Sequence, residues 1–567
     1  MRRSLAVLFA AACAVVAMWA MAGASTAATT THQWKFDPTI NAPWALEGDE
    51  TALDTPAAAA GLCRSAPVNL PGAYAPLAAT EVDAIVGDPV NNSGFSNFGC
   101  TTPQNETTIA VNPTNPNNVI AGANDYRVCC DFTGLNDATA WAYYSTNGGA
   151  SWANVQVPGL TAETGGQGVF KKFDSAGDPA MAFSPDGVAY YANIVFSRVS
   201  FASGVAVSVS RDGGQTWSDP NLLTFVEAGN FFHDKEWIAA GSNGQVAVTW
   251  TRFSLGPKGA GYKSSPIVSA LSKDYGKTWN NAGSPVSDNA HPFNQGSQVQ
   301  YGPDGALYVA YEASSPTTGY ATDAMVVARS TDAGKTFVTK ELARVYDDLD
   351  CYPVFAGRQT LSDMHFRLNS YPSMSVDPVS GVISLAWSDQ QGSGTCGQGG
   401  GSFSGTTSNQ VKLIRSAWAT IGSAPVLQVT TSGPDKVFPS VANYNGKVVV
   451  SYYTRDYAYG TGAPGDVCHF RTNDGGGGNI APSPSANNVC LDYASKSWSG
   501  GSFSSQKRLS GQSSNPFVQF ADGGFIGDYS QVALGANGKA HASWTDFRGN
   551  PGVNSPNQDV LIANYNP

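Results

Sequence analysis

The densest cluster of titratable side chains in the sequence lies in the segment His233–Trp237. It reads His-Asp-Lys-Glu-Trp and offers two carboxyl groups, those of Asp234 and Glu236. A second cluster, Gly527–Tyr529, adds another carboxyl group and a phenol. Hydrolysis of a glycosidic bond needs two carboxyl groups about 5–10 Å apart, one to protonate the leaving oxygen and one to act as base or nucleophile. Asp234, Glu236 and Tyr529 are therefore the candidate catalytic residues.

Four arginines occupy similar places, just after segments that read as strands and end in aromatic residues. They are Arg127, Arg252, Arg455 and Arg548. If these strands end on one rim, the guanidinium groups could hold a carboxylate of a ligand through bidentate hydrogen bonds. The alternative is that each arginine pairs with a neighbouring aspartate and only stabilises the fold.

The elements that must position these residues recur seven times. Each repeat is a strand, a short turn rich in Asn, Asp and Gly, and a second strand that ends in an aromatic residue. The repeats begin at Glu106, Asp178, Glu236, Gln298, Tyr371, Phe438 and Asp528. Three of them carry a proline near the start of the first strand, where the others carry polar residues; these are Pro179, Pro372 and Pro439. A proline there suits a structural role, so Glu236 and Tyr529 stand out.

A short motif, S-x-[DN]-x-G-x-[ST]-[WF], follows the second strand in the first four repeats. Its copies begin at Ser145, Ser210, Ser272 and Ser330. The Asp or Asn can accept hydrogen bonds from turn amides, and the Gly can adopt a positive φ. The motif therefore predicts a turn between a third and a fourth strand, and its role is structural.

This motif resembles the Asp-box, or bacterial neuraminidase repeat, of the sialidase-like β-propellers. The resemblance implies an all-β propeller, whose repeats we count as seven four-stranded blades, with six as the alternative. The seventh repeat shows only three strands, so we expect a strand within Thr80–Val86 to close the ring. A ligand site is expected on the face opposite the Asp-boxes.

The resemblance also implies an activity, namely that of a secreted exo-acting glycosidase on acidic or complex glycans. In that family a Tyr attacks the sugar, a Glu serves as its base and an Asp as acid/base, which suits Tyr529, Glu236 and Asp234. The four arginines would correspond to the family's arginine triad. The Arg-Ile-Pro signature is absent from this sequence. The alternative function is a non-catalytic propeller that binds a glycan or a protein at the cell surface.

Composition indicates export. Arg2 and Arg3 precede an apolar run, so residues 1–24 are predicted to be a signal peptide, 25–78 an extended leader and 79–567 a single propeller. The mature chain would keep 30 basic against 43 acidic residues, a net charge of −13. That charge argues against nucleic acid and anionic membranes as partners. No later segment reaches 18 apolar residues, so no further membrane-spanning helix is expected. We expect a secreted, extracellular monomer with a carbohydrate ligand.

The sequence favours disulfides over metal sites. Eight Cys remain after the signal peptide, and no His lies at ligand spacing near them. Cys468 and Cys490 flank a Gly- and Pro-rich insertion and form the expected pair, and Cys351 with Cys396 is a second. The partners of Cys63, Cys100, Cys129 and Cys130 stay open. No cofactor is expected; a structural calcium ion at Asp347–Asp350 has a solvated acidic loop as its alternative.

Mass spectrometry of the unreduced, protease-digested protein tests this expectation. A peptide carrying Cys468 should be joined to one carrying Cys490, and all eight mature Cys should be oxidised. A free thiol at Cys468 or Cys490 would contradict the pairing.

Overall fold

The computed structural model describes residues 81–86, 103–129, 136–257, 261–320, 322–346, 352–355, 358–390, 406–457, 489–511, 513–514, 516, 524–547 and 558–567. The predicted signal peptide and leader lie outside these residues, as do Arg548, Asp347–Asp350 and Cys468. Residues 33–567 form one compact unit. Within it, the described residues contain strands and three short 3-10 helices and no α-helix. No described helix is long and apolar enough to cross a membrane.

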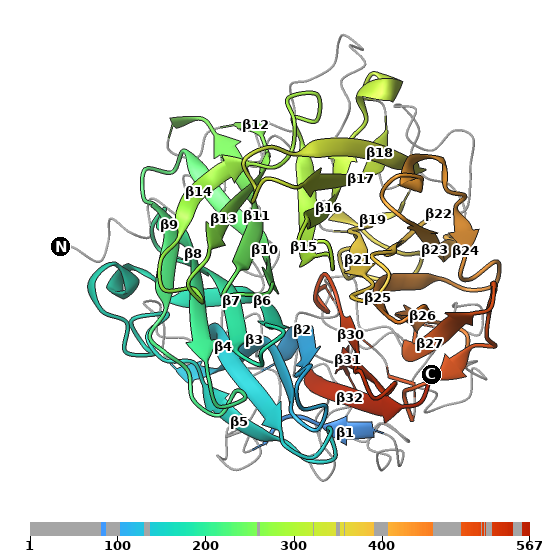
Figure 1. Cartoon of the computed structure of the whole chain (residues 1–567), viewed down its shortest axis with the longest axis horizontal. Helices are drawn as coiled ribbons and strands as arrows, with labels where there is room; N and C mark the ends of the chain where they lie inside the picture. The colour runs from blue at the N-terminus through green and yellow to red at the C-terminus, as the bar shows by residue number, and fades with distance from the viewer. Residues whose placement is uncertain are drawn as a thin grey trace, which may run out of the picture. The chain divides into compact units, whose positions relative to one another are not determined.

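Seven four-stranded antiparallel sheets are arranged in a ring, which confirms the seven-bladed prediction (Figure 1). Blade 1 contains β2 (Gln104–Val111), β3 (Val119–Cys129), β4 (Asn136–Ser145) and β5 (Ala153–Gln156). Blade 2 contains β6 (Ser175–Phe183), β7 (Ala189–Phe196), β8 (Ser203–Ser210) and β9 (Asn221–Val226). Blade 3 contains β10 (Phe231–Ala240), β11 (Val246–Leu255), β13 (Ile267–Ser272) and β14 (Asn280–Pro285), with β12 (Tyr262–Ser264) beside β11. Blade 4 contains β15 (Asn294–Tyr301), β16 (Leu307–Ser314), β17 (Asp323–Ser330) and β18 (Val338–Val345).

The remaining three blades follow the same order. Blade 5 contains β21 (Ser373–Val376), β22 (Ile383–Gln390), β23 (Asn409–Ser416) and β24 (Leu427–Gln428). Blade 6 contains β25 (Lys436–Tyr444), β26 (Lys447–Thr454), β27 (Asp492–Ser499) and β28 (Ser502–Phe503), with β29 (Lys507–Arg508) also on β27. Blade 7 contains β30 (Gln531–Leu534), β31 (Ala540–Asp546), β32 (Asp559–Tyr565) and β1 (Glu81–Asp83). Outside the blades lie a hairpin, β19 (Val354–Phe355) with β20 (Arg358–Gln359), and the 3-10 helices η2 (Gly168–Lys172), η4 (Pro316–Thr318) and η6 (Ile421–Ser423).

The ring is closed by two segments far apart in sequence. β1 pairs antiparallel with β32, with Val82 opposite Ile562, so the expected N-terminal closing strand is confirmed. The innermost strands contact their neighbours around the ring, and β30 of blade 7 contacts β2 of blade 1. Closure leaves the sheets with few exposed edges.

Each of the four predicted motif turns joins the third and fourth strands of its blade. In blade 2 the Oδ1 atom of Asp212 accepts the Thr216 amide at 2.9 Å, and Ser210 Oγ accepts the Gly214 amide at 2.8 Å. Gly214 has a φ of 94°, a conformation that favours glycine. In blade 3, hydrogen bonds from the Thr278 hydroxyl and amide lower the pKa of Asp274 to about 2. These turns are structural, as the sequence predicts.

The apolar core lies between the faces of adjacent sheets. Three tryptophans at equivalent positions of the second strand are fully buried in blades 3, 5 and 7; they are Trp250, Trp387 and Trp544. The ends of the polypeptide contribute as well, because Ala84 and Ile85 pack with Val560 and Ile562. Packing of sheet on sheet therefore fixes the positions of the innermost strands around a central channel.

Removing the strand that closes the ring should destabilise it. We expect a chain that begins at residue 87 to be less stable than one that begins at residue 79 by about 3 kcal/mol or more, because the buried Ile85 would be lost and Ile562, which pairs with Val82 and packs in the same apolar cluster, would be exposed. Urea denaturation of the two proteins measures the difference. Equal midpoints and slopes would show that β1 is dispensable.

Candidate functional site

The start of the innermost strand is distorted in the same way in five blades. The pairing of the first two strands shifts register there, at a β-bulge, in blades 1, 2, 3, 4 and 6. The bulged residues have positive φ: Glu106 (55°), Asp178 (54°), Lys235 (51°), Gly296 (66°) and Phe438 (49°). This conformation costs a non-glycine residue about 1–2 kcal/mol. Bulges of this kind re-aim a side chain, here at the channel.

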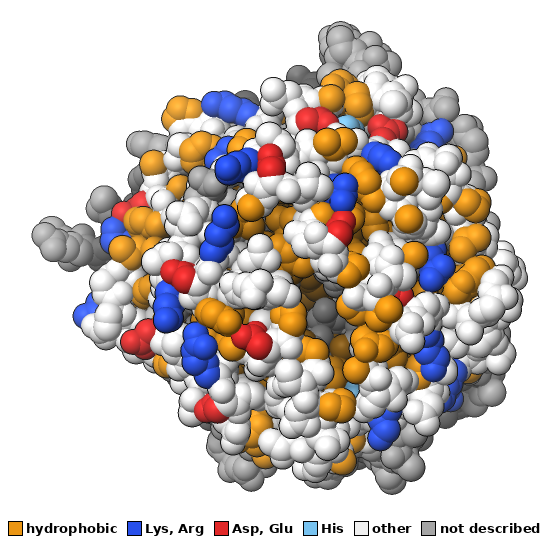
Figure 2. All heavy atoms as spheres, in the orientation of Figure 1, with side chains coloured by type: hydrophobic (Ala, Val, Ile, Leu, Met, Phe, Trp, Pro, Cys, Tyr) orange, Lys and Arg blue, Asp and Glu red, His pale blue; other side chains and the backbone are white. Residues whose placement is uncertain are grey.

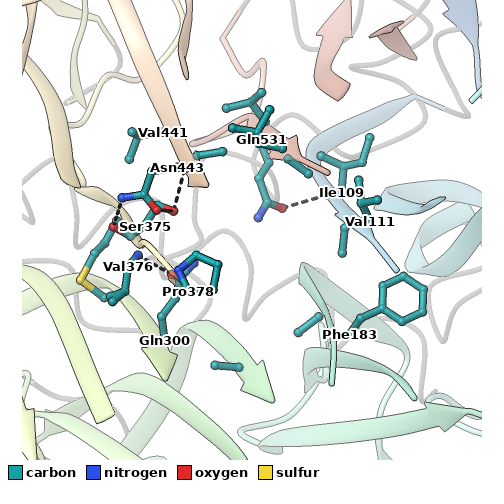
Figure 3. Close-up of a pocket in the computed structure, with 18 of the residues that line it drawn as sticks. Ile109, Val111, Phe183, Gln300, Ser375, Val376, Pro378, Val441, Asn443 and Gln531 are labelled. Carbon is teal, nitrogen blue, oxygen red and sulfur yellow. Dashed lines mark hydrogen bonds between the residues drawn. The ribbon is translucent and has the colours of Figure 1, made fainter. Parts of the chain in front are cut away.

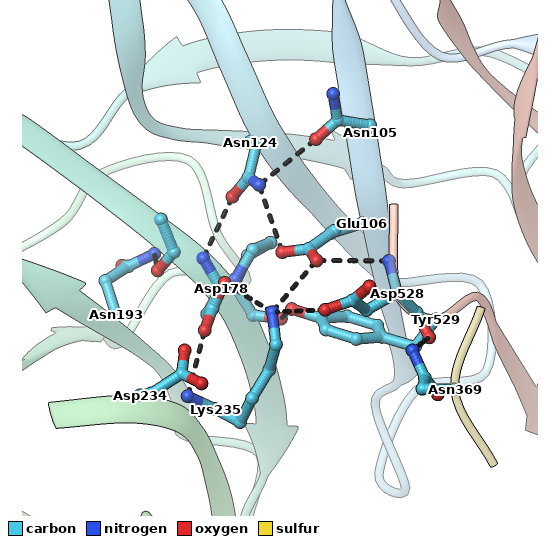
Figure 4. Close-up of polar contacts among 12 residues, drawn as sticks. Asn105, Glu106, Asn124, Asp178, Asn193, Asp234, Lys235, Asn369, Asp528 and Tyr529 are labelled. Carbon is cyan, nitrogen blue, oxygen red and sulfur yellow. Dashed lines mark hydrogen bonds and ion pairs between the residues drawn. The ribbon is translucent and has the colours of Figure 1, made fainter. Parts of the chain in front are cut away.

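Lys235 occupies the centre of the site (Figure 4). Its ammonium nitrogen lies 3.0 Å from Oε1 of Glu106, 3.1 Å from Oδ1 of Asp178 and 3.0 Å from Oδ2 of Asp528. These carboxyl groups come from blade 1, from blade 2 and from the segment that leads into blade 7. All four side chains are at least 94% buried. A lysine has three donors, so its hydrogen-bonding capacity is used in full.

The cluster extends beyond the lysine. Asp528 also receives two hydrogen bonds from Arg367, at 2.8 and 2.9 Å. Asn124 donates to Oε2 of Glu106 at 3.0 Å. The backbone amide of Lys235 donates to Oδ2 of Asp178 at 2.9 Å, so Lys235 binds this carboxylate through its main chain as well as its side chain.

Burial and nearby charges shift the pKa values of the carboxyl groups in opposite directions. Burial raises the pKa of Glu106 well above its usual range, and Lys235 only partly offsets this. Burial alone would also raise the pKa of Asp528, but the charges of Arg367 and Lys235 outweigh it and lower that pKa. The pKa of Asp178 is likewise lowered, because Lys235 and two hydrogen bonds outweigh burial. Protonated and ionised carboxyl groups therefore lie side by side.

Glu236 differs from its neighbours because its carboxyl group is buried without a partner. The residue is 1% exposed, and neither carboxylate oxygen has a hydrogen-bond partner among the described residues. Burial, followed by the negative charge of Asp178, raises the pKa of Glu236 well above its usual range. A buried and unpaired carboxyl group stays protonated and can donate that proton.

Tyr529 crosses the channel from blade 7. Its hydroxyl donates to the carbonyl of Pro179 in blade 2 at 3.2 Å, and its ring packs edge-on against Trp237 of blade 3 at 5.9 Å. Burial, and then the charges of Glu106 and Asp178, raise the pKa of Tyr529 well above its usual range. The phenol is therefore neutral, and its oxygen faces a backbone carbonyl.

A small cavity of about 30 Å³ brings these groups together. Glu236 and Tyr529 line it, together with Lys235, Asp528 and the aromatic ring of Phe438. A cavity of this size has room for about one water molecule. Two of the predicted catalytic residues thus share one cavity, although they come from different blades, and Asp234, next to Lys235 in the chain, adds its negative charge to the same cluster.

The predicted arginines are not equivalent in the structure. Arg127 forms a buried ion pair with Asp125 at 2.7 Å and stacks on Trp141. Arg455 pairs with Asp435 at 3.0 Å and is also buried. Arg127 and Arg455 thus follow the alternative in which the arginine pairs with an aspartate and stabilises the fold.

Arg252 and Arg548 complete the set. Arg252 lies opposite His233 in the sheet, its guanidinium 5.2 Å from the ring of Phe231, and none of the described carboxylates pairs with it. Burial lowers its pKa. It lines neither this cavity nor the second channel cavity described below. Arg548 lies outside the described residues.

The sequence alignment of the repeats is off by one position in blade 3 and by two in blade 4. The bulges place Glu106 in register with Asp178 and Lys235, so Glu106 does not match Glu236. Gln298 similarly follows Gly296 by two residues. One sequence feature could have identified the carboxyl groups of the cluster, because Glu106, Asp178 and Asp528 each begin a repeat. Nothing in the pattern pointed to Arg367, which lies between blades.

No group of three or more metal-ligating side chains is found among the residues the structure describes.

Comparisons with known proteins give distant structural likenesses. No protein-family model matches the sequence, and no curated protein matches it. Similar solved structures include the Hadza microbial sialidase Hz136, with 12% identity, 76% of this chain and 78% of that chain covered, and a TM-score of 0.40. They also include the Penicillium chrysogenum alpha-L-arabinanase, with 15% identity, 68% and 92% covered, and a TM-score of 0.35. A protein of unknown function from Dyadobacter fermentans has 15% identity, 63% and 91% covered, and a TM-score of 0.40. At these distances no residue role is transferred.

Replacing Lys235 by Met should lower stability by about 3–5 kcal/mol at pH 7, because buried carboxylates would lose their counter-charge. Asp178 and Asp528 have lowered pKa values in the folded state. Their contribution is therefore present above the ordinary Asp pKa of about 4 and is lost as the pH falls through the folded values.

The destabilisation by Lys235→Met should accordingly shrink between pH 7 and about pH 4, as the orphaned carboxyl groups become protonated. Urea denaturation at the two pH values measures it. Lys335→Met, at an exposed lysine, is the control and should change stability by less than about 0.5 kcal/mol. A pH-independent loss would show that the ion cluster does not act through charge.

Proposed function

We propose that this protein is a glycoside hydrolase that acts on an uncharged glycan at the channel mouth opposite the Asp-boxes. The observation that carries the proposal is the cavity that Glu236 and Asp528 share: neither carboxylate oxygen of Glu236 has a hydrogen-bond partner among the described residues, and burial raises its pKa, whereas Arg367 and Lys235 lower the pKa of Asp528. Carboxyl groups whose surroundings push their pKa values apart are the usual acid and base of glycosidases.

In the proposed reaction Glu236 is the general acid. It gives its proton to the oxygen of the leaving sugar, and an ionised carboxylate of the cluster, Asp178 or Asp528, stabilises the positive charge that develops on the cleaved ring or activates water. Tyr529 is proposed to position the substrate rather than to attack it, since its phenol is neutral and already bonded to the Pro179 carbonyl. This departs from the role that the sialidase resemblance implies.

The charge balance of the cluster supports an uncharged substrate. Five carboxyl groups, on Glu106, Asp178, Asp234, Glu236 and Asp528, surround two cations, Lys235 and Arg367, and both cations are paired with carboxylates. Arg127 and Arg455 are paired as well. Among the described residues that form the cluster or line its cavity, no cation is left unpaired to meet a sugar carboxylate, whose entry would therefore cost free energy. We therefore propose a neutral glycan in place of an acidic one.

A second candidate function is glycan binding without catalysis. It is favoured by the completeness of the cluster, because Glu106 is 0% exposed and Lys235 has no donor left for a ligand. In that case the cluster would serve only to hold the blades together. Export, an extracellular location and a monomeric state also remain proposals that rest on the sequence.

Activity of Glu236→Gln distinguishes the two functions. The purified protein is screened on labelled neutral oligosaccharides and on sialosides, and the substrate found is used for kinetics. The variant should lose at least about a hundredfold in kcat, because the amide has no proton to give, while keeping its stability. Glu227→Gln, at an exposed carboxylate on the surface, is the matched control and should retain full activity.

The pH profile gives an independent check. Glu236 must be protonated to act, and its pKa is raised, so activity should persist above pH 4.5 and be lost as the pH rises through the elevated pKa. Full turnover by Glu236→Gln would place the chemistry elsewhere. Binding without cleavage would favour the second candidate, and cleavage of sialosides alone would overturn the neutral substrate.

A further inference from the structure

The other end of the channel contains a second and larger cavity, of about 310 Å³. It is lined by the innermost strands of the seven blades beyond the bulges and by their turns, from Val111 and Pro113 onward. These turns lie beside the Asp-boxes, since the amide of Gly148 donates to Asn117 at 2.8 Å and Asn118 donates to Gly213 at 2.9 Å. The space-filling view shows a central hollow on one face, bordered mainly by hydrophobic side chains (Figure 2).

None of the described residues that line this cavity is charged. Its lining contains no Asp, Glu, Lys, Arg or His, although the chain carries 75 charged residues in all. The walls combine apolar side chains, such as Ile109, Phe183 and Val376, with uncharged polar ones, such as Gln300 and Asn443 (Figure 3). A charged ligand would lose its hydration there without gaining a partner. The cavity is thus suited to an uncharged ligand, and its volume falls in the range of ordinary ligand sites.

Three glutamines of the lining accept a backbone amide of the neighbouring blade through Oε1, which fixes the direction of their NH₂ groups; Gln298 accepts the amide of Met374 at 2.7 Å. Oε1 of Gln531 accepts the Ile109 amide at 2.8 Å and the Thr108 hydroxyl at 2.7 Å, and Oε1 of Gln300 accepts the Val376 amide at 2.7 Å. A backbone N–H can only donate, so the bonded side-chain atom must be the oxygen and the amide orientation is settled.

The side-chain nitrogens of Gln300 and Gln531 are therefore left for a ligand. None of the described residues accepts a hydrogen bond from Nε2 of Gln300 or Gln531, and Figure 3 shows the nitrogen of Gln531 pointing into the open space. These bonds join blade 7 to blade 1 and blade 4 to blade 5. The contacts that assemble the ring thus also orient the donors.

We propose that this cavity is a binding site for one uncharged sugar ring. Sugar hydroxyls accept hydrogen bonds from the two amide nitrogens, and the C–H faces of the ring pack on the apolar walls. The site is separate from the carboxyl cluster, but the two cavities share Trp237, Gln298 and Ser373 in their walls, so they adjoin along one channel. Binding here does not depend on hydrolysis at the other end.

Isothermal titration with D-galactose, L-arabinose and D-glucuronate tests the proposal, because monosaccharides contain no glycosidic bond to cleave. The protein should bind a neutral sugar with a Kd below about 10 mM and should not bind glucuronate. Gln531→Glu and Gln300→Glu keep the accepting oxygen and lose the NH₂ donor, so each should weaken binding about tenfold.

Two further variants separate this effect from misfolding. Gln215→Glu changes an exposed glutamine of the blade 2 turn and should leave the affinity unchanged. Ala182→Phe fills the cavity without touching the glutamines and should abolish binding. If no neutral sugar binds, or if Ala182→Phe and Gln531→Glu bind as the unmodified protein does, the cavity is a solvent channel and the proposal is wrong. Glycosidase activity would be unaffected by that outcome.

Discussion

The ion cluster around Lys235 ties the first and last parts of the chain together. One ammonium group contacts carboxyl groups from blade 1, blade 2 and the start of blade 7, and Arg367 adds the segment before blade 5. Removing one member of such a buried cluster leaves uncompensated charge, whereas the intact cluster contributes little net stability. Its main effect is to fix which strands meet at the channel mouth. The bulged residues with positive φ hold their strain only because this cluster and the surrounding sheets over-determine them.

The same cluster decides which groups remain able to react. Lys235 and Arg367 are occupied by carboxylates, and the rim arginines Arg127 and Arg455 are occupied by aspartates of their own surroundings. Carboxyl groups outnumber cations, so burial retains protons on some of them. Neither carboxylate oxygen of Glu236 has a hydrogen-bond partner among the described residues, and burial raises its pKa, which is why its proton is the one proposed for transfer.

One set of strands builds two chemically different ends of the channel. In blades 1, 2 and 3 the bulges at the start of the innermost strand turn charged side chains inward, namely Glu106, Asp178 and Lys235. Residues further along the same strands, such as Gln300, Val376 and Gln531, are uncharged and bond across blade boundaries. A repeat fold achieves this because every blade contributes a residue to each layer of the channel. The polarity and charge of a layer therefore depend on seven separate residues.

Much of the architecture could be predicted from the sequence, because local patterns specify it. Alternating apolar residues, turn residues and the four copies of the S-x-[DN]-x-G motif predicted strands, turns and the blade count, and the missing fourth strand of the seventh repeat pointed to residues 80–86. The sequence also provided three candidate catalytic residues, Glu236, Tyr529 and Asp234. The tertiary structure alone decided which residues meet: it shifted Glu106 into register with Lys235, added Arg367, and enclosed Arg127 and Arg455 in ion pairs. A β-bulge shifts the strand register by one residue, and ring closure pairs strands that are hundreds of residues apart in the sequence. Local periodicity encodes neither.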